Sequence, residues 1–289
     1  WFCHTLLERN TNESAARVPG IGTLNELLLP WYLLTGMISG FLGGLLGIGG
    51  GIVIVPALIL VFDATGNIPL EHSTPVAVAT SLACIVFTSL SAAYAQLRAD
   101  MVEWMVVRRW LAPVVMGSLT AGYIAPLLSV TLFRTFIGVF LGLVSFVMLT
   151  NWKPSPNRQF PGPITAAGAG VLAGLVSGIA GIGGGNVMVP TQVFFNIPVH
   201  RATATSSALG VAVAGAGAAG YIVFANDFMP DTAALLGYVY LPAFAAIVGG
   251  AVLSAPVGVR VAHRVQPIWL RRVFGVLLVL VAGRMLLTA

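Results

Sequence analysis

Residues 47–56 read GIGGGIVIVP, and residues 181–190 repeat the pattern as GIGGGNVMVP. The two copies start 134 residues apart (181 minus 47). They differ in side-chain polarity only where the polar Asn186 replaces the apolar Ile52. Each glycine costs a helix about 1 kcal/mol relative to alanine, so a run of glycines interrupts an apolar helix. An interruption that recurs in the same sequence context indicates a functional site.

The composition places the surrounding chain in a membrane. Of its 289 residues, 57% are hydrophobic and only 8% are charged, whereas soluble domains carry roughly a quarter charged residues. We therefore expect an all-α polytopic membrane protein that has the lipid bilayer as a partner. The net charge of +5 does not indicate a nucleic-acid partner, because basic residues in membrane proteins mainly set the orientation of the chain.

The two halves of the chain repeat one order of elements. In each half we expect a pair of apolar arms separated by the glycine run, followed by three membrane spans. The expected arms are 31–46 and 52–62 in the first half, and 164–180 and 186–197 in the second. The expected spans are 76–96, 110–128 and 135–150, then 203–225, 233–257 and 273–287.

These elements predict one integrated membrane domain. Its expected parts are a flexible lead-in at 1–29, a first repeat at 30–152, a polar, proline-containing linker at 153–163 and a second repeat at 164–289. The lead-in has no apolar core before Leu27, so we expect no cleaved signal peptide.

Charge distinguishes two possible topologies. If each glycine-containing segment crosses the membrane once, the Lys and Arg residues divide 8 to 6 between the two sides. If each segment instead enters and returns as a re-entrant helix pair, the division becomes 10 to 4, with only Arg9, Arg17, Arg134 and Arg284 on the outer side. The second arrangement obeys the positive-inside rule. Each half then crosses three times, so the halves are expected to be inverted repeats.

The glycine runs are the first candidate binding site. The second arm of each half begins directly after the glycines, so its free N–H groups and positive dipole end should point to one central place. Glycine lets an anion approach the backbone closely, and the candidate residues are Gly49, Gly50, Gly51, Gly183, Gly184 and Gly185. The alternative is that the runs at 47–51 and 181–185 only permit close helix packing. Small residues also precede each run, among them Gly36, Gly40, Gly170 and Gly174.

Polar side chains near the runs extend the candidate site. Ala-Thr-Ser opens the next span of each half and supplies Thr80 and Ser81 in the first, Thr205 and Ser206 in the second. Their hydroxyls could donate to substrate oxygens, or they could cap or bond back to their own helices. Asn186, at the start of the second arm, is open to a ligand contact and to a capping role.

Other polar residues are expected to be structural. We expect Gln192 to bond a neighbouring helix, Arg201 to set orientation and Cys84 to act as a small hydrophobe. No acidic or basic residue falls in the middle of an expected span, which argues against a buried proton relay. The sequence shows neither enzyme signatures nor metal-ligand spacings, so we expect no catalysis, metal or cofactor.

Two GIGGG runs followed by Val-Pro, each leading to Ala-Thr-Ser, resemble the TauE/SafE sulfite exporter family of bacterial permeases. The likeness covers roughly residues 31–287. It implies a multi-pass protein of the bacterial inner membrane that transports small sulfur-containing anions, such as sulfite or organosulfonates, commonly outward. The functional positions that it implies are the two glycine runs and the two Ala-Thr-Ser segments.

The leading hypothesis is therefore a secondary transporter that alternates access between inverted halves. A passive anion channel on the same scaffold is the alternative. An intramembrane enzyme is the third class considered, and it lacks any catalytic set of residues.

Overall fold

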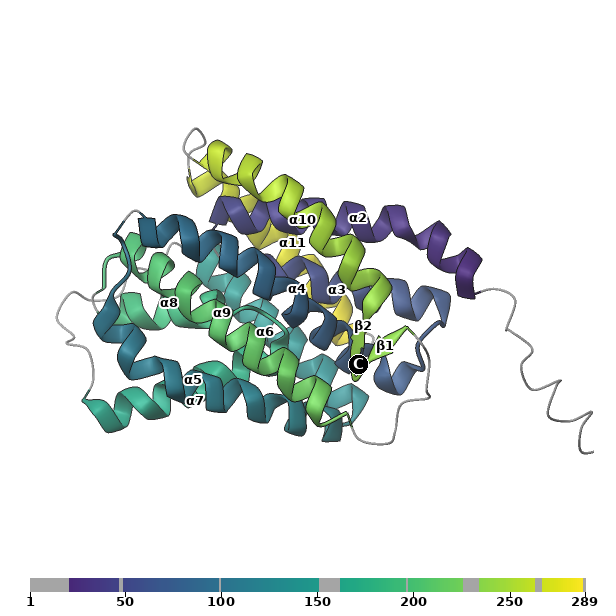
Figure 1. Cartoon of the computed structure of the whole chain (residues 1–289), viewed down its shortest axis with the longest axis horizontal. Helices are drawn as coiled ribbons and strands as arrows, with labels where there is room; N and C mark the ends of the chain where they lie inside the picture. Colours follow the sequence, from purple (N-terminus) through teal and green to yellow (C-terminus); the bar gives the residue numbers. More distant parts are fainter. Residues whose placement is uncertain are drawn as a thin grey trace, which may run out of the picture.

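The computed structural model describes residues 21–46, 49–98, 100–150, 162–195, 197–225, 234–262 and 267–287. Within these residues the protein is helical apart from one short hairpin, as Figure 1 shows. The first half contains α2 (Ile21–Leu46), α3 (Gly51–Thr65), α4 (Leu70–Arg98), α5 (Trp104–Ile124), the 3-10 turn η1 (Ala125–Leu127) and α6 (Val130–Thr150). The second half contains α7 (Pro163–Ala180), α8 (Gly185–Phe194), α9 (Val199–Val223), β1 (Leu235–Leu236), β2 (Val239–Tyr240), α10 (Leu241–Ala262) and α11 (Pro267–Leu287).

The helices have the length and surface of membrane spans. Within the described residues, six stretches are long and apolar enough to cross a membrane, and they lie on α4, α5 with η1, α6, α7, α9 and α10. The outward faces carry large apolar side chains, such as Leu253 on α10 at 76% exposure and Phe146 on α6 at 66%. Lipid accommodates such a surface and water does not. The expected all-α polytopic membrane protein is thereby confirmed.

Several helices begin earlier than hydropathy indicates. Helix α2 begins at Ile21 rather than at residue 31, and α6 begins at Val130 rather than at 135. Helix α5 begins at Trp104, which makes Arg108 and Arg109 helical rather than part of a loop. A helix continues beyond the hydrocarbon layer into the interface, where polar side chains cost little, so hydropathy underestimates its length. Residues 1–20 of the expected lead-in and 153–161 of the expected linker lie outside the described residues.

The expected span at 233–257 begins only at Leu241, because a hairpin precedes it. Strands β1 and β2 pair antiparallel, with Leu236 opposite Val239. Gly237 has a φ of 58°, the left-handed conformation that a tight two-residue turn requires. The aromatic and β-branched residues that follow it favour a strand over a helix.

The long helices pack in pairs that join the two halves (Figure 1). Helices α4 and α9 lie against each other in the middle, and α6 lies against α11. Helix α2 lies against α10 and α5 against α7, and α5 also packs on α9. The first helix of each half therefore packs on the fourth helix of the other half.

Glycine makes two of these pairings possible. A methyl group added at any of six glycines would meet atoms of the partner helix, and in five of the six it would meet partner backbone. The six are Gly36, Gly40 and Gly44 on α2, against α10, and Gly170, Gly174 and Gly178 on α7, against α5. These small residues therefore allow the paired helices to pack closely.

Candidate functional site

Each glycine run adopts a backbone that favours glycine. The φ angles are 78° at Gly49, 73° at Gly50, 67° at Gly181 and 47° at Gly184. All four lie in the left-handed region, which costs a residue with a Cβ about 1–2 kcal/mol. The runs thus end α2 and α7 and allow α3 and α8 to start in a new direction.

The first run turns the chain back on itself near the middle of the molecule. The Ser39 hydroxyl on α2 donates to the Gly50 carbonyl oxygen at 3.0 Å, so the chain returns past α2 after the break. A methyl group on Gly51 would contact Ile85, which lies one residue from the midpoint of α4, residue 84 from its bounds of 70 and 98. Helix α3 therefore starts beside the centre of α4.

The two glycine runs meet at this central place. A methyl group on Gly51 would lie 2.8 Å from the Gly181 carbonyl oxygen, and one on Gly49 would lie 3.9 Å from that of Gly183. On the α9 side, a methyl group on Gly210 would lie 3.7 Å from the same Gly183 oxygen. The sequence-predicted glycines of the two halves are therefore brought together, with α4 and α9 on either side.

One face of α4 holds both runs. The Ser81 hydroxyl donates to the Gly181 carbonyl oxygen at 2.8 Å, and the Thr88 hydroxyl donates to that of Gly49 at 3.0 Å. Between them Ile85 lies against both runs, since a methyl group on Gly49 or Gly183 would touch its side chain. Residues 81, 85 and 88 follow helical spacing, so they share this face.

The threonines of the two Ala-Thr-Ser segments make equivalent structural bonds. The Thr80 hydroxyl accepts the backbone N–H of Tyr240, directly before α10, at 3.0 Å. The Thr205 hydroxyl accepts the backbone N–H of Glu103, directly before α5, at 2.9 Å. Each threonine therefore bonds the residue directly before the fourth helix of the other half. Ser206 accepts a bond from Gln192 Nε2 at 2.8 Å, which confirms that Gln192 bonds a neighbouring helix.

Asn186 lies in the first turn of α8 and is only 6% exposed. Among the described residues, neither its Nδ2 nor its Oδ1 has a hydrogen-bond partner, and Oε1 of Gln192 on the same helix also has none. The amide therefore makes no capping bond there. A buried polar group left unpaired costs about 1–3 kcal/mol, which is a reason to look for a ligand.

The other polar residues lie away from the runs. Cys84 is buried with its Sγ 3.9 Å from the Phe244 carbonyl oxygen of α10, and Arg201 pairs with Glu103 at 2.6 Å. Within the described residues, no three His, Cys, Asp or Glu side chains are grouped so that they could hold a metal ion.

Sequence reasoning missed several residues around the runs. Thr88 is one of them, although its spacing of seven residues from Ser81 on one helix could have shown it. Ile85 gave no signal, because an isoleucine in an apolar span has no distinguishing chemistry. Hydropathy assigns the buried Arg134 to a loop, although Val130, Leu132 and Phe133 before it could have indicated a longer helix.

Comparisons with known proteins agree with this architecture. Residues 32–285 match the family model described as Sulfite exporter TauE/SafE. A probable membrane transporter protein of Haemophilus influenzae is 31% identical over 262 residues, which cover 88% of this chain and 97% of the relative. The probable membrane transporter protein YunE of Bacillus subtilis is 27% identical over 276 residues, with 88% and 96% covered.

A further relative comes from Methanocaldococcus jannaschii, a probable membrane transporter protein that is 26% identical over 249 residues. No solved structure matches the chain. The family model spans both glycine runs and every helix from α3 to α10, and it ends within α11. The chain belongs to the TauE/SafE sulfite exporter family and is a multi-pass membrane transporter rather than an enzyme.

Proposed function

We propose that this transporter moves small sulfur-containing anions, such as sulfite or organosulfonates, outward across a bacterial inner membrane. The observation that carries the proposal is the meeting of two glycine-broken helix starts beside an unpaired, buried amide, that of Asn186. Helix N-termini attract anions through their free N–H groups and positive dipole ends. The family model that matches this chain is described as a sulfite exporter.

The proposed binding site contains Gly49, Gly50 and Gly51 from the first run, and Gly183, Gly184, Gly185 and Asn186 from the second. The hydroxyls of Thr80, Ser81, Thr205 and Ser206 support it from α4 and α9. In transporters with inverted repeats, broken helices meet near the middle of the membrane in this way. The start of α3 beside the midpoint of α4 supports the same arrangement here.

The proposed mechanism is alternating access between inverted halves. Two features support it: the exchanged packing of α2 on α10 and α7 on α5, and the matching bonds of Thr80 and Thr205 to the starts of α10 and α5. A two-fold relation that interchanges the halves would produce both. Two similar halves that pack on each other can rock around a site held between them.

Calorimetry on the purified protein tests the substrate. Sulfite, sulfoacetate, taurine, thiosulfate and sulfate are titrated in turn, and we expect saturable binding of at least one sulfonate or sulfite. Uptake into proteoliposomes preloaded with the unlabelled anion then tests the mechanism. A carrier exchanges label and saturates, whereas flux that rises without saturation and never accumulates label would indicate a channel. Binding of none of the five anions would contradict the proposed substrate class.

A further inference from the structure

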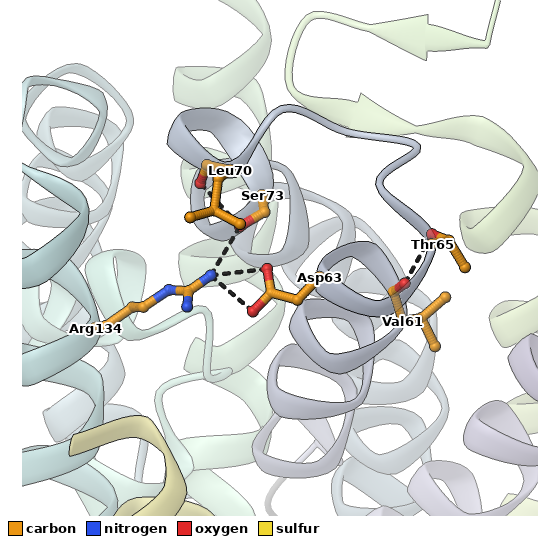
Figure 2. A network of polar contacts seen from close by, with 6 residues as sticks. All are labelled: Val61, Asp63, Thr65, Leu70, Ser73 and Arg134. Atoms are coloured by element: carbon orange, nitrogen blue, oxygen red, sulfur yellow. Dashed lines mark hydrogen bonds and ion pairs between the residues drawn. The ribbon is translucent and has the colours of Figure 1, made fainter. Parts of the chain in front are cut away.

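A single buried guanidinium joins three helices at one end of the molecule. Arg134 on α6 is 3% exposed, and its Nη2 donates to both carboxylate oxygens of Asp63 on α3 at 2.8 Å. The same Nη2 lies 3.2 Å from the hydroxyl oxygen of Ser73 on α4. Figure 2 shows the guanidinium of Arg134 directed at the gap between the end of α3 and the start of α4.

Arg134 differs from the other charged residues in its burial. Among the residues whose burial is described, it is the one charged side chain that is buried. A charge removed from water is tolerated only when it is paired and hydrogen-bonded, so Arg134 and Asp63 depend on each other. Ionisable residues inside membrane spans are costly and usually functional, and no part of the proposed anion site accounts for this pair.

Asp63 connects the pair to the anion site through α3. Helix α3 starts at Gly51, and Asp63 follows twelve residues later (63 minus 51), about 18 Å along a helix at 1.5 Å per residue. Ile54, Leu58 and Phe62, between these ends, are each no more than 1% exposed. A helix packed so tightly moves as one body, so the interaction that fixes Asp63 also fixes the position of the glycine end of α3.

The second half has no matching anchor within the described residues. Helix α8 ends at Phe194, and the position 134 residues after Asp63 is the apolar Ile197. On α8, only Gly185, Asn186, Met188 and Gln192 are buried, and two of these carry unpaired amide atoms. The two arms of the site are therefore built differently, one fixed at its far end and one not.

We propose that Arg134 is a positioning residue of the anion site. By holding Asp63 it fixes α3 along its axis, and so sets where Gly49, Gly50 and Gly51 lie against the second glycine run. This inference rests on the proposed function, because the position of α3 matters to binding only if its glycine end meets the anion.

The test uses Arg134→Gln, Asp63→Asn and the double variant that combines these two changes. Glu103→Gln is the control. The control breaks the half-exposed Glu103–Arg201 pair, which lies on neither arm of the site, and it keeps the backbone N–H that Thr205 accepts. Dissociation constants for sulfite and sulfoacetate are measured by calorimetry, at a temperature at which melting curves show every variant folded. We expect each single variant to weaken binding about tenfold, which is 1.4 kcal/mol, and the double variant to be no weaker than either.

Two further variants keep the test decisive if Arg134→Gln does not fold. Arg134→Lys retains a donor for Asp63 and should bind within about threefold of wild type, while Ser73→Ala removes one acceptor and should weaken binding about threefold. Wild-type anion affinity in folded Arg134→Gln and Asp63→Asn would overturn the proposal, and so would wild-type affinity in Ser73→Ala. Anion binding weakened equally in the Glu103→Gln control would also overturn it. If the wild-type protein binds neither anion, the proposed function fails instead, and the two failures are distinguishable.

Discussion

At the residue scale, the two halves of the site differ most at Asn186. Its counterpart Ile52 is buried and apolar, whereas both polar atoms of the Asn186 side chain lack partners among the described residues. An anion held by helix N-termini still has oxygens that need donors, and an amide NH₂ can supply one. The second half should therefore contribute more hydrogen bonding to the anion than the first.

Asn186→Leu tests this asymmetry. A hydrogen bond to a charged group is worth about 1.5–3 kcal/mol, so anion binding should weaken by about tenfold to a hundredfold. Ile52→Leu, the matched control, removes no polar group and should change the dissociation constant by less than about threefold. Both constants are measured by calorimetry with the tightest anion of the screen. Equal small effects at the two positions would leave Asn186 without a role in binding.

A second residue-scale prediction separates backbone strain from steric exclusion. Gly50 and Gly184 both have positive φ, but a methyl group on Gly50 would collide with the backbone and hydroxyl of Ser39, whereas one on Gly184 would meet the flexible end of Met188 at 3.2 Å. Replacement of either by alanine costs about 1–2 kcal/mol of strain. Only Gly50→Ala adds a clash with backbone, so it should lose more transport and melt at a lower temperature than Gly184→Ala.

Proteoliposome uptake and thermal melting of both alanine variants provide the measurement. Replacement of either glycine by valine should abolish transport, because a β-branched side chain would also block the approach of the anion. If both valine variants transported at the wild-type rate, the glycine runs would be packing features only.

The sequence can predict the site only where chemistry repeats. The glycine runs and the Ala-Thr-Ser segments occur twice, so Gly51 and Gly185, or Thr80 and Thr205, are recognisable as pairs from the amino-acid sequence alone. Ile85 cannot be found in this way, because its position between the runs depends on how α4 crosses them.

At the element scale, Thr80 and Thr205 show how the central helices position their neighbours. Each hydroxyl accepts a backbone N–H that directly precedes a long helix, at Tyr240 before α10 and at Glu103 before α5. These N–H groups precede a helix start, where intrahelical partners are missing. Each threonine therefore fixes where the next long helix enters the bundle.

Thr80→Val and Thr205→Val test whether these hydroxyls act on the fold or on the substrate. Valine keeps the shape and removes the acceptor, which leaves a backbone N–H unpaired at a cost of about 1–3 kcal/mol. Both variants should therefore melt at a lower temperature than the wild-type protein, while the anion dissociation constant stays within about threefold. A weakened dissociation constant without a change in melting temperature would instead place the hydroxyls on the substrate.

Element boundaries are less predictable than element order. Hydropathy locates the apolar centre of each helix, but α5 and α6 carry arginines near their N-terminal ends that the pattern assigns to loops. Arg134 can be buried within α6 because Asp63, distant in sequence, neutralises it. The hairpin before α10 depends on Gly237 and on contacts with Tyr221 at the end of α9. No sequence window contains these long-range partners.

At the scale of the whole molecule, the exchanged helix pairs and the fold-back after Gly50 support the re-entrant topology. The Ser39 hydroxyl reaches the Gly50 carbonyl oxygen, which a helix continuing straight through the membrane would not allow, since residues 39 and 50 would lie about 16 Å apart. In this topology the paired arms return to the side from which they came. Each half would then cross an odd number of times, with the second half inverted relative to the first.

Cysteine labelling tests this topology in intact cells. Single cysteines are placed at Asn67, Asn157 and Asn226 in a background in which Cys3 and Cys84 are replaced by alanine, and an impermeant maleimide is added outside. Asn157 and Asn226 lie outside the described residues, so their expected sides follow from the division of basic residues, 10 on one side and 4 on the other. We expect labelling at Asn67 and Asn226, and at Asn157 only after the cells are permeabilised. If Asn226 shared the side of Asn157, the second glycine-containing segment would have to cross the membrane once, and the inverted-repeat arrangement would be wrong.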